Sequence, residues 1–126
     1  MPEWTPPPLH QLETEVMEDV WGREPATVRE VLEALNRGPR QRAYTTVMTI
    51  MARLHRKGLL KRRREGKTDL YWPALSRPAY LDARARAEVE ALVEEFGDVA
   101  LAHFASQVGH LDPERLEKLR RLADRG

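Results

Sequence analysis

Apolar residues recur at helical spacing in the middle of the chain, between residues 43 and 58. Four of them stand at positions i, i+3, i+4 and i+7, the pattern of a helix that packs one face on a core. They are Val47, Ile50, Met51 and Leu54. Gly58 follows the last of them, where a helix often ends with a left-handed residue. The other positions hold threonines and then arginines, so the pattern predicts an amphipathic helix with a polar, cationic exposed face.

Two shorter helical patterns precede this stretch. The first predicts a helix over about residues 9–21 that Gly22 closes. The second starts with Thr27 and Glu30, a T-x-x-E capping box in which each side chain satisfies a backbone donor of the first turn. The second helix is expected to end at residues 36–39, which include a glycine and a proline. The apolar positions of the two helices are Leu9, Leu12, Val16, Met17, Val20 and Trp21, then Val28, Val31, Leu32 and Leu35.

The spacing changes after Gly58. Residues 59–64 and 68–73 form two short segments on either side of a turn that contains Gly66, and the second segment is rich in aromatic residues. This pattern predicts a β-hairpin. Three short helices followed by a basic hairpin form a winged helix-turn-helix, in which residues 36–42 are the turn between the second and third helices.

A different composition begins near Arg77. Helical spacing predicts three more helices, over residues 80–96, residues 99–108 and from Pro113 onward, with Asp112 as the N-cap of the last. About 45 residues bury too little surface to fold alone, so these helices pack either on the winged helix or on a second copy of themselves. We favour the second copy, because dimeric helix-turn-helix proteins need an interface. The expected dimer-interface residues are Leu81, Ala85, Val89, Leu92, Phe96, Leu101, Phe104, Leu116, Leu119 and Leu122.

The chain of 126 residues is therefore expected to be mainly α-helical. Its three parts are a flexible, proline-rich segment over residues 1–8, a winged-helix domain over residues 9–76 and a helical dimerisation domain over residues 77–126.

Composition excludes several classes of protein. Cysteine is absent, which excludes disulfides, thiolate metal sites and cysteine nucleophiles. No apolar run reaches the ~20 residues of a membrane span, and the N-terminus lacks the order of charged and apolar residues in a signal peptide. We therefore expect an intracellular, cytoplasmic protein without membrane insertion. No phosphate loop, zinc-protease or hydrolase motif is present, and the four histidines lie on different predicted elements. Neither an enzyme, a metal site nor a cofactor is predicted.

Charge is distributed unevenly, although the net charge is only +1. Residues 40–67 carry ten basic residues against one acidic residue, Glu65. Positive charge is thus concentrated on the third helix and the hairpin, as expected of a surface that binds a polyanion.

The exposed face of the third helix has residues suited to the DNA major groove. Threonine offers a hydroxyl to phosphates and base edges and a methyl group to thymine, arginine clamps phosphates, and hairpin cations reach the backbone or minor groove. The alternative is a protein-interaction module whose basic face docks on an acidic partner. The residues expected to bind double-stranded DNA are Arg40, Arg42, Tyr44, Thr45, Thr46, Met48, Thr49, Arg53, Arg56, Arg64 and Lys67.

Several stretches resemble the penicillinase-repressor (BlaI/MecI-type) family of transcriptional regulators. The most specific is the run Tyr-Thr-Thr-Val at residues 44–47, with Arg-Leu at 53–54 and Lys-Gly at 57–58. Residues 12–21 and 26–31, the hairpin residue Tyr71 and the Glu-Lys-Leu-Arg-Arg-Leu pattern near the C-terminus also match. The resemblance covers residues 9–124.

This resemblance implies a homodimeric winged-helix repressor on a pseudo-palindromic operator, often with TACA/TGTA half-sites. In the β-lactam branch, a membrane sensor protease lifts repression by triggering cleavage between an asparagine and a phenylalanine. The matching bond here is His103–Phe104, so the asparagine is missing. Copper-responsive relatives use C-terminal cysteines as metal ligands, and this chain has none.

Overall fold

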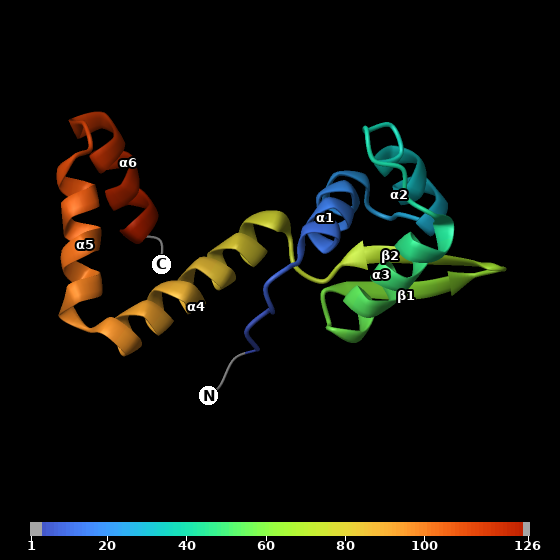
Figure 1. Cartoon of the computed structure of the whole chain (residues 1–126), viewed down its shortest axis with the longest axis horizontal. Helices are drawn as coiled ribbons and strands as arrows, with labels where there is room; N and C mark the ends of the chain where they lie inside the picture. The colour runs from blue at the N-terminus through green and yellow to red at the C-terminus, as the bar shows by residue number, and fades with distance from the viewer. Residues whose placement is uncertain (1–3, 125–126) are drawn as a thin grey trace. The chain divides into compact units, whose positions relative to one another are not determined.

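The computed structural model describes residues 4–124. The chain divides into two compact units, one before and one after the bond between Ala85 and Arg86. Figure 1 labels the helices and strands along the chain. They are α1 (Gln11–Arg23), α2 (Val28–Leu35), α3 (Tyr44–Arg56), β1 (Leu60–Glu65), β2 (Thr68–Pro73), α4 (Arg77–Phe96), α5 (Asp98–Gly109) and α6 (Pro113–Asp124).

In the first unit, α1, α2, α3 and the hairpin pack together (Figure 1), and each contributes residues to one core, as does Tyr80 of α4. The predicted apolar stripe of α3 is fully confirmed, since each of its four residues is buried. Val16, Met17 and Val20 of α1 pack with them, and so does Val31 of α2. The hairpin adds its own buried residues, Leu60 and Tyr71. Three helices and a hairpin around one core confirm the predicted winged helix-turn-helix.

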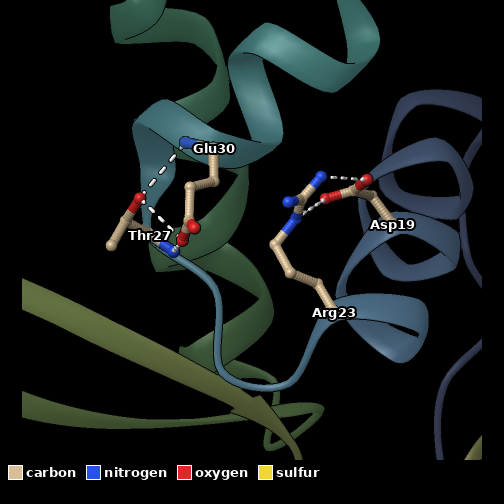
Figure 2. Close-up of polar contacts among 4 residues, drawn as sticks. All are labelled: Asp19, Arg23, Thr27 and Glu30. Carbon is tan, nitrogen blue, oxygen red and sulfur yellow. Dashed lines mark hydrogen bonds and ion pairs between the residues drawn. The ribbon is translucent and has the colours of Figure 1, made fainter.

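The predicted capping box of α2 is present (Figure 2). The backbone N–H of Thr27 donates to the Glu30 carboxylate at 2.9 Å, and the backbone N–H of Glu30 donates to the Thr27 hydroxyl at 3.1 Å. The end of α1 differs from the prediction, because the helix continues past Gly22 to Arg23. The Arg23 guanidinium reaches back one turn to Asp19, at 3.0 and 3.1 Å, and so stabilises the two added residues (Figure 2).

The two strands pair antiparallel from Leu60 opposite Pro73 to Glu65 opposite Thr68. Gly66 in the turn between them has φ +62°, a conformation that favours glycine. A third short segment joins the hairpin, because Ala26 exchanges two backbone hydrogen bonds with Tyr71, each 2.9 Å long. This bridge attaches the hairpin to the segment that leads into α2.

The proline-rich segment was predicted to be flexible over residues 1–8, of which 1–3 lie outside the described residues. In the described part, Pro6 is fully buried. The Tyr80 hydroxyl donates to the Pro7 carbonyl at 2.9 Å, and the Arg84 guanidinium donates to the Pro6 carbonyl at 3.2 Å. Residues 6 and 7 therefore lie in an extended stretch that is anchored to the first turns of α4.

The three helices predicted for the C-terminal part are present. α4 begins at Arg77, before the predicted residue 80, because the Ser76 hydroxyl accepts the backbone N–H of Ala79 at 3.2 Å. Gly97, with φ +59°, separates α4 from α5. As predicted, Asp112 caps α6, where its carboxylate accepts the backbone N–H of Arg115 at 2.8 Å.

Candidate nucleic-acid interface

The helix α3 has two unlike faces. Met51 is fully buried, whereas Met48, one turn earlier on the other face, is 43% exposed. Tyr44 at the start of the helix is exposed too, and so are Thr45, Thr46 and Thr49, so the first turns are open to a ligand. Of the residues expected to bind DNA, all are exposed except Arg42: Arg40, Tyr44, Thr45, Thr46, Met48, Thr49, Arg53, Arg56, Arg64 and Lys67.

Arg42 differs from the other predicted contacts because its side chain faces the protein. Its guanidinium pairs with Glu15 of α1 at 3.2 Å, its Nε is buried without a hydrogen-bond partner, and its side chain is only 20% exposed. The side chain of Asn36 accepts the Arg42 backbone N–H at 2.7 Å and donates to its carbonyl at 3.1 Å. These contacts give Arg42 a role in fixing the turn between α2 and α3.

The C-terminal end of α3 is held by a glycine cap. The backbone N–H of Leu59 donates to the Leu54 carbonyl at 2.9 Å, and that of Gly58 donates to the His55 carbonyl at 3.0 Å. This pair of bonds is a Schellman motif, which requires a left-handed residue at its centre. Gly58 has φ +84°, as the sequence predicted.

A buried ion pair joins this end of α3 to the start of α1. Glu13 is 1% exposed, and its carboxylate accepts from the Lys57 ammonium at 2.7 Å and from the His10 backbone N–H at 3.0 Å. Burial by itself raises the pKa of Glu13, but these hydrogen bonds and the charge of Lys57 outweigh it and lower the pKa below the ordinary value. The sequence did not reveal this pair, because Glu13 and Lys57 stand 44 positions apart in the chain.

We expect this pair to make stability depend on pH at the acid end. A carboxylate with a folded-state pKa below 4.5 stabilises the protein above that pH, and its contribution is lost as the pH falls through the folded-state pKa. Glu13→Gln should therefore be less stable than the unchanged protein at neutral pH, and the difference should shrink below pH 4.5. Urea denaturation at a series of pH values measures this. A difference that stays constant with pH would show that Glu13 acts only through packing.

Several hairpin cations contact neighbouring side chains. The Arg63 guanidinium lies over the Trp72 ring, with its carbon 5.0 Å from the ring centroid, and also pairs with Glu65 at 3.2 Å. Arg64 pairs with Asp69 at 3.5 Å. Both arginines remain more than 60% exposed, and exposed pairs of this kind are weak. These contacts hold the two arginine side chains near the hairpin and leave them exposed, so that they remain able to bind a polyanion.

One exposed cation near α3 was missed by the sequence analysis. The guanidinium carbon of Arg29, on α2, lies 5.2 Å from the centroid of the Tyr44 ring. Arg29 stands outside the basic stretch of residues 40–67, so the distribution of charge along the chain did not mark it as a binding residue. Only the folded chain brings it beside the start of α3.

The residues expected in a dimer interface form apolar surface on the last three helices. Of the ten, all are exposed except Leu116, which is partly buried. Neither α5 nor α6 contains a buried residue, and α5 has no lysine or arginine and one acidic residue, Asp98. A helix that is apolar on several sides is normally buried against other helices or another chain. Two further apolar residues of α5, Val99 and Val108, are exposed and were not among the expected interface residues.

Phe96, Val99 and Phe104 contribute to an apolar hollow of about 360 Å³ within the second unit. Among residues 4–124, no group of three or more histidine or acidic side chains is placed to hold a metal ion. No helix in that range is long and apolar enough to cross a membrane.

Comparisons with known proteins agree with the resemblance seen in the sequence. The transcriptional regulator BlaI of Mycobacterium tuberculosis is 39% identical to this chain over 113 residues, which are 87% of this chain and 80% of that protein. The solution structure of the DNA binding domain of the repressor BlaI covers 62% of this chain and 93% of that chain, with 27% identity and a TM-score of 0.53. The Bacillus licheniformis BlaI monomeric form, solved in complex with the blaP half-operator, covers 60% and 90%, with 28% identity and a TM-score of 0.50. The profile of the penicillinase repressor family matches residues 9–125, and the chain therefore belongs to that family.

Proposed function

We propose that this protein is a transcriptional repressor that binds a pseudo-palindromic operator in double-stranded DNA as a homodimer. The observation that carries the proposal is the exposed face of α3, which presents Thr45, Thr49 and Arg53 while the opposite face is buried. The cationic hairpin lies next to it in the chain. The relative solved with a half-operator favours DNA over an acidic protein partner as the ligand of this face.

In the proposed mechanism, each protomer inserts α3 into a major groove. Thr45, Thr46 and Thr49 lie nearest the base edges, and Met48 contacts a thymine methyl group. Arg40, Arg53, Arg56 and the hairpin cations hold the phosphate backbone and set the register. Bound in this way, the dimer blocks transcription sterically. It would act in the cytoplasm, and no step requires catalysis by the protein.

The homodimer in this proposal is supported by the exposed apolar residues of α4, α5 and α6, which no other part of residues 4–124 buries. Two-fold symmetry is the commonest arrangement of protein oligomers, and it matches an operator with two half-sites. For derepression we propose a membrane sensor or protease that acts on these helices. Because His103 stands where the β-lactam branch has asparagine, the proposal places no cut at the His103–Phe104 bond.

Two substitutions on α3 test the proposed division of labour, in which arginines bind phosphates and threonines contact base edges. Arg53→Ala should weaken binding to all duplexes alike, and it should make the slope of log affinity against log salt less steep by about 0.9 for each phosphate that is no longer neutralised. Thr49→Ala should instead change the preference between the operator and other duplexes, because good base contacts discriminate by about 1–3 kcal/mol. Fluorescence anisotropy with DNA from upstream of the protein's own gene, and with a shuffled duplex, measures both effects.

The unchanged protein provides the reference in the same experiment. A dimer that neutralises about eight phosphates has a slope near −7. An affinity that does not depend on salt would contradict the proposed function. Identical behaviour of the Arg53 and Thr49 variants would contradict the division of labour.

A further inference from the structure

A groove of about 500 Å³ lies between the start of α2, the exposed face of α3 and the hairpin. Three cations line it: Arg29, Arg64 and Lys67. Asp69, the one acidic residue of the lining, is paired with Arg64 at 3.5 Å. The groove therefore has a surplus of positive charge, and an anion is the ligand that suits it.

The Arg29 side chain is placed so that it can bind an anion. Its side chain is exposed, and it makes no ion pair within residues 4–124. The guanidinium carbon lies 5.2 Å from the centroid of the Tyr44 ring, a cation–π contact that uses none of the N–H groups, so these remain able to donate. A guanidinium already held against a ring loses less conformational freedom when it binds a phosphate through two parallel hydrogen bonds.

We propose that Arg29 binds a backbone phosphate of double-stranded DNA, and that Tyr44 acts as the positioning residue that holds the Arg29 guanidinium. This inference rests on the proposed function and extends it to a residue of α2. It also changes the expected role of Tyr44, which then acts through Arg29 instead of through its own contact with DNA. A phosphate is the chemical group that fits, because Arg29 lies outside the face of α3 that reads base edges, and backbone contacts set the register of a DNA-binding domain.

The first test measures the number of neutralised phosphates. Arg29→Ala should make the salt slope less steep by about 0.9 per protomer, with an equal loss of affinity for the upstream duplex and for a shuffled duplex. Arg29→Lys keeps the charge but not the planar fork, so it should retain the slope while binding more weakly. Arg120→Ala, on α6, removes the same charge outside the groove and should leave the slope unchanged.

The second test isolates the role of Tyr44. Tyr44→Phe keeps the ring and should bind within about twofold of the unchanged protein. Tyr44→Leu should weaken binding when Arg29 is present and should have little further effect in the Arg29→Ala background. If Tyr44→Leu is equally harmful in both backgrounds, Tyr44 contacts DNA by itself and its positioning role is refuted. Tryptophan fluorescence confirms folding of each variant, and both residues are exposed, so the core is not altered.

The outcomes separate this inference from the function on which it rests. If the unchanged protein binds with a steep salt slope and Arg29→Ala keeps that slope, the phosphate contact is refuted and the proposed function stands. If the unchanged protein shows no salt-dependent binding to either duplex, the proposed function and this inference both fail.

Discussion

Leu101→Asp should convert the protein to a monomer and lower its affinity for the operator by about 100-fold or more. Leu101 is 49% exposed on α5, so the substitution leaves the isolated chain able to fold. In a dimer interface, however, the new carboxylate would be buried against apolar side chains, which is strongly unfavourable. Losing the second half-site removes the gain of about 10²–10⁴ that two linked binding events provide.

Light scattering after gel filtration measures the oligomeric state of this variant, and anisotropy measures its affinity. Leu101→Met conserves volume and should remain dimeric. Gln107→Glu adds a negative charge at a polar position of the same helix and controls for charge alone. A Leu101→Asp protein that stays dimeric with normal affinity would show that the apolar surface of α5 is not the dimer interface.

Met51→Ala should lower the free energy of unfolding by about 2–5 kcal/mol, because it leaves a cavity in a packed core. Met48→Ala changes the same side chain on the same helix, but Met48 is 43% exposed whereas Met51 is fully buried. It should change stability by no more than about 0.5 kcal/mol and should weaken operator binding instead. The pair of variants therefore separates the face that holds α3 in place from the face that contacts DNA.

Urea denaturation at one fixed protein concentration measures both stabilities, since dimerisation shifts the apparent value. The three tryptophans, Trp4, Trp21 and Trp72, all lie in the first unit, so their fluorescence reports its unfolding. Equal losses of stability in the two variants would contradict the two-faced description of α3.

Local patterns were enough to predict the elements that carry the proposed site. The T-x-x-E box at Thr27 and Glu30 placed the start of α2, because both partners of its hydrogen bonds lie within one turn. Gly58 placed the end of α3, because the hydrogen bonds of a glycine cap also join residues within about one turn. Gly66 placed the hairpin turn. The buried stripe of α3 followed from periodicity alone, since a helix with one apolar face buries its apolar residues in only one orientation.

The sequence also showed which residue types are available to bind DNA, because the cluster of cations between residues 40 and 67 is visible in the chain. Whether these side chains contact an operator stays a prediction. Helix ends were predicted less closely than the helices themselves. α1 ends later and α4 begins earlier than predicted, because Arg23 and Ser76 make hydrogen bonds that add residues to these ends.

Contacts between distant parts of the chain were settled only by the tertiary structure. Glu13 is a charged residue that the periodicity of α1 did not place in the core, yet folding buries it against Lys57. Arg42 belongs to the basic stretch, yet it pairs with Glu15 of α1. Arg29 comes beside Tyr44 because α2 and α3 pack on one core. Periodicity and capping describe residues within a few positions of one another, whereas the partner of a charged side chain depends on how whole helices pack. For this protein, the sequence alone determines a winged helix with positive charge concentrated on α3 and the hairpin, and the packing of α1, α2 and α3 decides which of the cations remain exposed.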